Sequence, residues 1–249
     1  MIAYPNAKIN IGLNILRKRE DGYHDIESIF YPIHNLIDIL EIVPANTFSI
    51  KTTGLEIPSG LNICEKAYLV LKEDFNIPYV HIHLHKQIPI GSGLGGGSSD
   101  GAFTLKILNK LFRLNLDQYN LEKYAKRIGS DCTFFIDNKP KYVEGVGDKL
   151  SPIDLDLSLY EIRLSMPNIH VSTENAYSKI IANEKENTLY SDIFTPISVW
   201  KKSIKNDFES SIFRQYPEIR DIKKDFYQKG AVYSSMTGTG SAVYGIFSR

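Results

Sequence analysis

A glycine-rich run leads without a break into a helical stretch in the first half of the chain. Residues 89–101 read Pro-Ile-Gly-Ser-Gly-Leu-Gly-Gly-Gly-Ser-Ser-Asp-Gly, and apolar residues with helical spacing follow from Ala102 onward. Glycine permits the positive φ angles that bring backbone N–H groups close to an anion, and the first turn of a helix offers unpaired amides and a favourable dipole. The run therefore predicts a phosphate-binding loop at a helix start, with a nucleotide as its ligand.

Two well-known phosphate motifs fit this run only in part. Gly91 and Gly96 have the spacing of a P-loop, but Gly97 occupies the position of the P-loop lysine. Together with Gly93 they also spell the dinucleotide-binding pattern, which requires a strand after the helix that ends in an acidic residue. Here a second helical stretch follows almost directly, with Asp117 at its start. Both motifs are rejected, which leaves a third kind of phosphate loop or a flexible surface linker.

Two further segments complete a pattern with this loop. Residues 3–13 read Ala-Tyr-Pro-Asn-Ala-Lys-Ile-Asn-Ile-Gly-Leu, and residues 234–242 read Ser-Ser-Met-Thr-Gly-Thr-Gly-Ser-Ala. In this order the three segments resemble the three motifs of the galactokinase, homoserine kinase, mevalonate kinase and phosphomevalonate kinase superfamily. The resemblance implies an α+β, two-lobed small-molecule kinase fold, with a ribosomal-protein-S5-domain-2-like N-terminal lobe and a ferredoxin-like C-terminal lobe.

Within the superfamily, four features are similar to one branch. They are Lys8 in Pro-Asn-Ala-Lys-Ile-Asn, the run Asp21-Gly-Tyr-His24, the triple glycine, and residues 129–135, which read Gly-Ser-Asp-Cys-Thr-Phe-Phe. That branch uses ATP to phosphorylate the 2-hydroxyl of 4-diphosphocytidyl-2-C-methyl-D-erythritol, giving the 2-phosphate, in non-mevalonate isoprenoid biosynthesis. The resemblance therefore implies this reaction.

The chain departs from the pattern of this branch at a few positions. The branch usually reads Gly-Ala-Asp-Val-Pro-Phe-Phe around its catalytic aspartate, whereas this chain has Ser130 before Asp131 and Cys132-Thr133 after it. Asp100-Gly101 and Asp148 are further departures. They put the local loop geometry in question, but Asp131 itself is intact.

The resemblance also assigns roles to residues by their position. The expected catalytic residues are Lys8 and Asp131. The expected substrate contacts are Asn10, Tyr23, His24, Phe30 and Tyr177. The expected ATP contacts are Asn62 and the loop residues Pro89, Ile90, Gly91, Ser92, Gly93, Leu94, Gly95, Gly96, Gly97, Ser98 and Ser99. The implied cofactors are ATP and Mg²⁺, and no residue is assigned as a metal ligand.

Residue chemistry agrees with these roles and also leaves ordinary alternatives. A carboxylate with a pKa of ~4 is too acidic to deprotonate a free alcohol outright, so Asp131 must accept the proton late in a loose transition state. Lys8 can pair with it and offset charge on the transferred phosphoryl group. Asp131 could otherwise be a surface carboxylate and Lys8 a strand lysine. Core packing is the alternative for Phe30 and Tyr177, and helix capping is the alternative for Asn62.

Composition narrows the class of protein. Lys plus Arg and Asp plus Glu number 29 each among 249 residues, so no basic excess suggests a nucleic-acid or membrane partner. No apolar run reaches the ~18 residues of a membrane span, and the N-terminus has no signal pattern. We expect a cytoplasmic enzyme whose partners are ATP and a small-molecule substrate, as a monomer or weak homodimer. Cys64 and Cys132 have no metal spacing and are expected to be packing residues.

The hydrophobic pattern predicts alternating strands and helices. Strands are expected at 6–14, 36–43, 47–53, 80–84, 160–165, 231–236 and 242–247, and helices at 62–75, 98–113, 117–128, 173–183, 199–214 and 217–229. A Pro- and Asp-containing stretch near residue 152 predicts two domains, 1–152 and 153–249.

Three histidines alternate with apolar residues in one of these strands. Alternation places His81, His83 and His85 on one face with ~6.6 Å between successive residues, which is too far for all three to converge on one zinc ion. We therefore interpret them as a solvated strand face.

Two rival functions remain at this point. One is a kinase of the same fold that acts on another small alcohol such as homoserine or mevalonate. The other is a regulatory protein that binds a nucleotide and transfers nothing, although such a protein would have no need of Lys8 and Asp131.

Overall fold

The computed structural model describes residues 1–58, 60, 62–180 and 187–249. The chain forms two compact units that are interleaved along the sequence. The first unit comprises Met1–Lys8, Pro32–Ile90 and Gly95–Lys139, and the second comprises Ile9–Tyr31, Gly91–Leu94 and Pro140–Arg249. The linear boundary near residue 152 stays a prediction.

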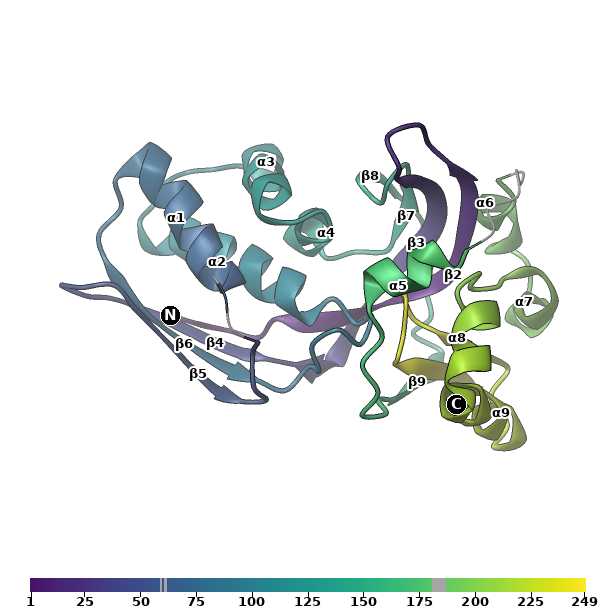
Figure 1. Ribbon diagram of the computed structural model, residues 1–249. Coiled ribbons are helices and arrows are strands. Elements are labelled where there is room, and N and C mark those ends of the chain that lie inside the picture. Colours follow the sequence, from purple (N-terminus) through teal and green to yellow (C-terminus); the bar gives the residue numbers. More distant parts are fainter. Residues whose placement is uncertain (59, 61, 181–186) are drawn as a thin grey trace. The chain divides into compact units, whose positions relative to one another are not determined.

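The first unit is built on a sheet with the strand order β1-β4-β6-β5. Strand β6 pairs with β5 in parallel and with β4 antiparallel. The apolar residues Leu40, Ile42 and Leu84 are buried, and helices α1 and α2 cover one face of the sheet (Figure 1). The bounds are β1 (Ile2–Ala3), β4 (Ile39–Pro44), β5 (Ser49–Gly54), β6 (Val80–Lys86), α1 (Ile63–Phe75), α2 (Gly96–Leu111), α3 (Gln118–Ile128) and α4 (Cys132–Asp137).

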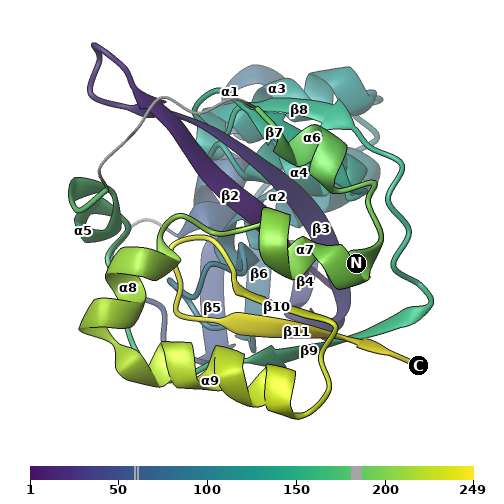
Figure 2. The ribbon, with the colours of Figure 1, turned by 90° about the vertical axis from the view of Figure 1, so that its right-hand side faces the viewer.

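The second unit contains the sheet β10-β11-β9 and most of the sheet β2-β3-β7-β8. Helix α9 packs against β10 and β11 (Figure 2). The strands are β2 (Asn6–Lys18), β3 (His24–Ile37), β7 (Lys141–Glu144), β8 (Lys149–Pro152), β9 (Tyr160–Ser165), β10 (Tyr233–Met236) and β11 (Val243–Ser248). The helices are α5 (Thr173–Ser178), α6 (Leu189–Asp192), α7 (Ile197–Ser203), α8 (Glu209–Gln215) and α9 (Pro217–Gln228).

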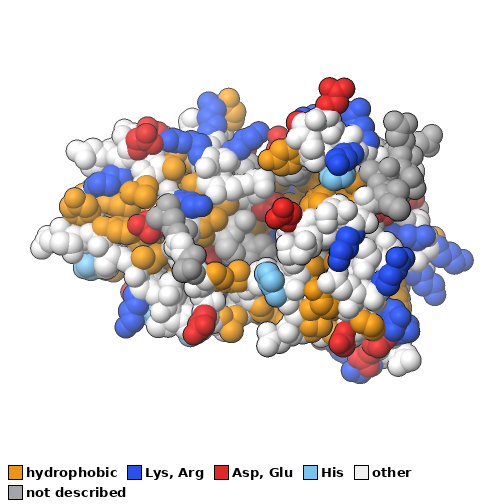
Figure 3. Space-filling model, viewed as in Figure 1, with side chains coloured by type: hydrophobic (Ala, Val, Ile, Leu, Met, Phe, Trp, Pro, Cys, Tyr) orange, Lys and Arg blue, Asp and Glu red, His pale blue; other side chains and the backbone are white. Residues whose placement is uncertain are grey.

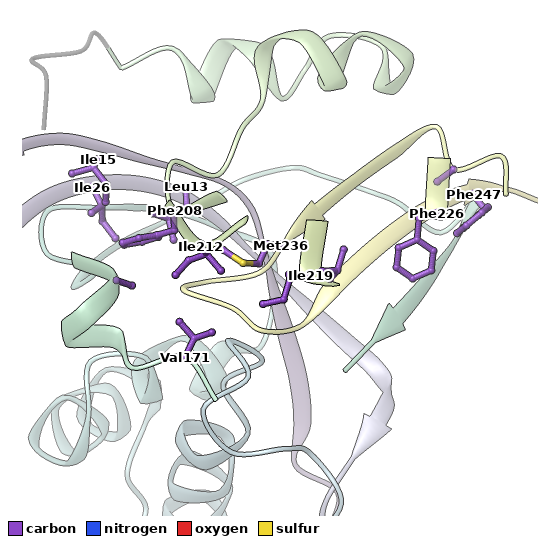
Figure 4. Close-up of a cluster of buried hydrophobic side chains, with 13 residues drawn as sticks. Leu13, Ile15, Ile26, Val171, Phe208, Ile212, Ile219, Phe226, Met236 and Phe247 are labelled. Atoms are coloured by element: carbon purple, nitrogen blue, oxygen red, sulfur yellow. The ribbon is translucent and has the colours of Figure 1, made fainter. Parts of the chain in front are cut away.

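A buried apolar cluster holds the second unit together. Leu13 and Ile15 from β2 pack with Phe208, with Ile212 from α8 and with Met236 at the end of β10 (Figure 4). The side chains come from segments more than 190 residues apart in sequence, so this core fixes β2 against the end of β10.

Most predicted elements are present, and one predicted helix is wrong. The stretch 199–214 is two helices, because the chain is extended at Ile204 and Leu13 of β2 pairs with Asn206. The strand expected at 36–43 corresponds to β4 (Ile39–Pro44), whereas β3 (His24–Ile37) was not expected. The helix expected at 173–183 ends at Ser178, and its last predicted residues, from 181, lie outside the described part of the chain.

The three histidines of β6 share one face of their sheet, as alternation predicts. The ring of His81 pairs with the Ser49 hydroxyl at 2.5 Å, and the Thr53 hydroxyl lies 3.0 Å from both His83 Nε2 and His85 Nδ1. The rings are thus paired with hydroxyls of β5.

The surface charges are mixed, as expected from the equal numbers of basic and acidic residues. Basic and acidic side chains are intermingled on the face drawn in Figure 3, and no large basic patch gathers there. Within the described ranges, no helix is both long and apolar enough to cross a bilayer.

Candidate active site

Helix α2 begins inside the glycine-rich run, as the sequence predicts. Gly95 caps the helix with a φ of +71°, and the Ser99 amide donates to its carbonyl at 3.0 Å. A Cβ on Gly95 would lie 3.0 Å from Lys8 Cγ and 3.1 Å from Phe135 Cζ. Glycine is therefore needed here both for the backbone angle and to leave room for the Lys8 side chain.

The structure brings Lys8 and Asp131 together in the first unit. The Lys8 ammonium lies 3.7 Å from the Asp131 carboxylate, and their side chains are 5% and 33% exposed. Burial lowers the pKa of Lys8, while Asp131 opposes that shift. A buried cation beside a carboxylate that stays open to solvent can stabilise anionic oxygens and accept a proton.

The residues that depart from the family pattern pack around Asp131 without displacing it. The Cys132 amide donates to the Gly129 carbonyl at 3.1 Å, which closes a turn that presents Asp131 at the start of α4. Cys132 is fully buried, and burial raises the pKa of its thiol to about 12. Its position matches the expected packing role.

A buried ionic cluster under α2 was missed in the sequence. The Lys86 ammonium binds the Asp38 carboxylate and lies 2.8 Å from Asp100 Oδ2. A Cβ on Gly96 would lie only 2.8 Å from Lys86 Nζ, so the ammonium lies directly against the first turn of α2. The departure at Asp100 was visible in the sequence, but its partners, Lys86 at the end of β6 and Asp38 between β3 and β4, were not.

Asp100 is the least satisfied member of this cluster. Its Oδ1 atom is buried with no hydrogen-bond partner among the described residues, as is the Ser99 hydroxyl. Burial, together with the Asp38 carboxylate, raises the pKa of Asp100 to about 8 despite the opposing charge of Lys86. One lysine does not fully offset two buried carboxylates, so this environment favours the protonated form of Asp100.

The second unit joins another part of the loop to the third glycine-rich segment. Gly93 has a φ of +81°, and a Cβ there would lie 2.1 Å from the carbonyl oxygen of Thr237. The Thr237 hydroxyl donates to the Gly93 carbonyl at 3.1 Å, and the Ala242 amide donates to the Ser92 carbonyl at 3.1 Å. Two motifs more than 140 residues apart in sequence thus fix each other's backbone.

Asn10 lies beside this contact. Its backbone N–H donates to the Thr237 hydroxyl at 2.9 Å, and its side-chain Nδ2 donates to the Ser28 hydroxyl at 2.9 Å. The residue is 2% exposed. Its predicted contact with the substrate stays a prediction.

An aromatic cavity of about 560 Å³ lies in the second unit. Tyr23, on the turn between β2 and β3, is 65% exposed, and the rings of His24 and Tyr177 are tilted by 32° at 5.3 Å. Tyr177 is anchored from behind by the Phe208 ring at 4.8 Å. Apolar surface is visible in this hollow between β2–β3 and α5 (Figure 3). The lining comprises Lys18, Gly22, Tyr23, His24, Val146, Thr173, Glu174, Tyr177, Ser178 and Ile180.

The chemistry of this cavity suits a flat heterocycle. Burial lowers the pKa of His24, and Lys18 contributes to that shift. A neutral imidazole has one donor and one acceptor nitrogen, and the aromatic rings offer faces for stacking. The cavity can therefore hold a base by its faces and by its polar edge.

Two other predicted contacts have ordinary structural roles here. Phe30 is 3% exposed and, among the described residues, is not part of the cavity lining. The Asn62 side chain accepts from the Cys64 amide at 2.8 Å and caps α1. Contacts of Phe30 with substrate and of Asn62 with adenine stay predictions.

Comparison with known proteins places the chain among kinases. A family model described as the GHMP kinases N terminal domain matches residues 62–138, and one described as GHMP kinases C terminal matches residues 198–249. The 4-diphosphocytidyl-2-C-methyl-D-erythritol kinase of Bacteroides fragilis is 50% identical over 254 residues, covering 100% of this chain and 92% of that protein. The enzyme of the same name from Azobacteroides pseudotrichonymphae is 50% identical over 252 residues, covering 100% and 94%.

Solved structures agree in fold. A crystal structure of 4-(cytidine 5'-diphospho)-2C-methyl-D-erythritol kinase matches with a TM-score of 0.84 and 29% identity, over 99% of this chain and 90% of that one. A homoserine kinase from Cytophaga hutchinsonii matches with a TM-score of 0.68 and 16% identity, over 98% and 85%, which shows a shared fold. These matches confirm the α+β kinase fold predicted from the sequence.

Proposed function

Because the chain belongs to the GHMP kinases, and within them to the family of 4-diphosphocytidyl-2-C-methyl-D-erythritol kinases, we propose that it transfers the γ-phosphate of ATP to the 2-hydroxyl of 4-diphosphocytidyl-2-C-methyl-D-erythritol. The products are the 2-phosphate and ADP, and the step belongs to non-mevalonate isoprenoid biosynthesis. One observation carries the transfer: Lys8, which is buried, lies 3.7 Å from Asp131, which is open to solvent.

Asp131 accepts the proton of the substrate hydroxyl. A carboxylate is a weak base, so the proton moves as the oxygen bonds to phosphorus, when the hydroxyl has become acidic. Lys8 keeps Asp131 oriented and offsets negative charge on the phosphoryl oxygens. Because Lys8 is buried, its charge is poorly screened by solvent and acts strongly on nearby oxygens.

The glycine-rich loop, Pro89 to Ser99, binds the phosphates of ATP. GHMP kinases use ATP as their phosphate donor. The helical start at Gly96 and the positive φ angles of Gly91, Gly93 and Gly95 support a cradle of backbone amides.

Mg²⁺ accompanies the nucleotide in this proposal. In kinase sites Mg²⁺ is held mainly by phosphate oxygens and water, with one or two protein ligands at most, so a dedicated protein cage is not needed. Among the described residues no cluster of three or more His, Cys, Asp or Glu side chains could hold a metal ion. When bound, Mg²⁺ would neutralise phosphate charge.

The aromatic cavity holds the cytosine. Tyr23 and Tyr177 supply ring faces, and neutral His24 supplies hydrogen bonds to the polar edge of the base. A cytoplasmic location and a monomeric or weakly dimeric state remain predictions.

Phosphorus NMR tests the whole proposal. The protein is mixed with ATP, Mg²⁺ and the cytidyl substrate, and in parallel with homoserine, mevalonate and galactose as acceptors. A new phosphomonoester signal with the cytidyl substrate alone is the expected result. Transfer only to another acceptor would overturn the substrate, and ATP binding without transfer to any acceptor would overturn the activity.

A further inference from the structure

Residues 206–209 read Asn-Asp-Phe-Glu; the first three lie between α7 and α8, and Glu209 begins α8. We propose that Asn206 is a positioning residue for ATP: it holds the turn Met236–Gly238, and this turn holds the phosphate-binding loop at Gly93. The inference rests on the proposed assignment of that loop to the phosphates of ATP.

Asn206 binds the turn through both hydrogens of its side-chain amide. Nδ2 donates to the Met236 carbonyl at 2.9 Å and to the Gly238 carbonyl at 2.8 Å, and Oδ1 accepts from the Phe208 amide at 3.0 Å. The residue is 3% exposed. A buried amide with these bonds is fixed in one orientation, and a side chain without N–H donors would remove both bonds to the turn.

The turn Met236–Gly238 also fixes the phosphate-binding loop. The Thr237 hydroxyl donates to the Gly93 carbonyl at 3.1 Å, and Gly93 lies so close that its added Cβ would be 2.1 Å from the Thr237 carbonyl oxygen. A Cβ on Gly238 would likewise lie 3.1 Å from Gly93 Cα. At such distances a shift of the turn must shift Gly93 as well, because there is no space to absorb it.

The residues that follow Asn206 are anchored to β2 and to Met236. The Asp207 amide donates to the Leu13 carbonyl at 2.9 Å, and the Ile15 amide donates to Asp207 Oδ2 at 2.8 Å, which ties the segment to β2. Glu209 accepts from the Met236 amide at 2.9 Å. Residue 236 is therefore held by Glu209 at its N–H and by Asn206 at its C=O.

Packing alone does not hold the turn. The side chains of Met236 and Phe208 belong to the apolar cluster (Figure 4) and stay buried if Asn206 is changed. Beyond Met236 the turn contains Thr237 and Gly238, and Gly238 has no side chain to pack. Loss of Asn206 therefore leaves the core in place and removes the two hydrogen bonds to the Met236 and Gly238 carbonyls, so the turn is held less firmly against Gly93.

The test is a double-mutant cycle with Asn206→Ala and Thr237→Val, read out as the Kd for Mg-ATP by calorimetry without acceptor. Each change should raise that Kd about 5- to 30-fold, as expected for one or two lost buried hydrogen bonds. In Asn206→Ala the KM for the cytidyl substrate should change less than about two-fold, since Asn206 does not line its cavity. Because both residues act on Gly93, the Kd for Mg-ATP of the double variant should rise by clearly less than the product of the two single fold-changes.

Asn109→Ala is the matched control. The Asn109 side chain also joins two backbone groups, donating to the Leu116 carbonyl at 2.9 Å and accepting from the Leu116 amide at 3.0 Å. It should lower the melting temperature but leave the Kd for Mg-ATP unchanged. Asn206→Asp, which keeps the shape and loses both donors, should weaken ATP binding like Asn206→Ala.

The results separate the two ideas. If Asn206→Ala and Asn206→Asp lose stability like Asn109→Ala yet bind ATP normally, or if the two single effects multiply independently, the positioning role is wrong. If Asn206→Ala does not fold, Asn206→Asp and Thr237→Val decide by the same criterion. Failure of the unaltered protein to bind ATP would instead overturn the proposed function, and the positioning role with it.

Discussion

The Lys8 ammonium lies 3.7 Å from the Asp131 carboxylate, and the lysine is buried while the aspartate keeps a third of its side chain exposed. The pair is therefore asymmetric: the cation is held in place by the protein, and the carboxylate can reach a ligand.

Replacing Asp131 by Asn should keep the fold and remove the base. The shape is preserved, but an amide does not accept the hydroxyl proton, so kcat should fall by about 10² to 10⁴. An ADP-release assay measures turnover, and circular dichroism checks folding. The exposed Asp154→Asn serves as the control and should retain full turnover. Unchanged turnover in Asp131→Asn would exclude Asp131 as the base.

Replacing Tyr23 by Ala should weaken binding of the cytidyl substrate and leave binding of ATP unchanged. The side chain is 65% exposed and lines the aromatic cavity, so its removal costs stacking and little stability. We expect KM for the cytidyl substrate to rise about 10-fold, in line with one lost stacking contact. Tyr119→Ala, which removes an equally exposed ring from α3, should leave both KM values unchanged. Equal effects of Tyr23→Ala on both substrates would argue against the cytosine role.

The affinity for the cytidyl substrate should fall in acid. Because burial and Lys18 lower the pKa of His24, the ring is neutral at neutral pH and becomes charged only when the pH falls through that lowered pKa. Charging removes its acceptor nitrogen, so KM for this substrate should rise in that range. NMR titration of the His24 ring should give a pKa below the usual value of about 6.5, and Lys18→Met should raise it. A pKa of His24 at or above the usual value would contradict this account.

Asp100 should make the protein less stable at alkaline pH. Its pKa is raised to about 8 in the folded state, where Lys86, Asp38 and Cys64 surround it, and is about 3.9 in an unfolded chain. Between these values the folded state binds the extra proton, so the free energy of unfolding falls as pH rises, and the contribution is lost above pH 8. Calorimetric melting between about pH 5 and 9 should show this slope in the unaltered protein and a flatter one in Asp100→Asn. The same slope in both proteins would show that Asp100 is ionised throughout.

Two glycines of the loop should respond oppositely to alanine. At Gly93 the new Cβ would lie 2.1 Å from the Thr237 carbonyl oxygen at a φ of +81°, so Gly93→Ala should destabilise the second unit by about 3 kcal/mol or more. At Gly97, within α2, a Cβ meets nothing within 4 Å, and Gly97→Ala should stabilise the free protein by up to about 1 kcal/mol. Denaturant unfolding without nucleotide measures both. Similar stabilities for the two variants would mean that the loop yields at Gly93.

The sequence was sufficient where a local rule decides the structure. Glycines followed by a helical pattern located the start of α2, and alternation located β6 with its histidines on one face. The pairing of Lys8 with Asp131 does not follow from local patterns. It was expected only because two distant segments resemble motifs of one family.

Local patterns failed where distant partners decide the structure. Strand β3 was not predicted because it contains the polar residues Glu27 and Ser28, which are nevertheless buried. The Glu27 carboxylate accepts a hydrogen bond of 2.8 Å from the hydroxyl of Tyr142 on the neighbouring strand β7. The helical pattern of 199–214 is interrupted after Ser203, and Asn206 in the interruption donates from Nδ2 to carbonyls some 30 residues away. Likewise the sequence around Lys86 is typical of a charged strand end, and only the folded structure shows that Lys86 forms ion pairs with Asp38 and Asp100.

The burial of Cys132 matters for the design of covalent inhibitors. It neighbours Asp131, which makes its sulfur an inviting target for an electrophilic warhead. Yet the sulfur is buried and its pKa is raised to about 12, so roughly one thiol in 10⁵ is a thiolate near neutral pH. An electrophile should therefore react slowly at Cys132, and the aromatic cavity lined by Tyr23 and Tyr177 is the better place for a reversible blocker.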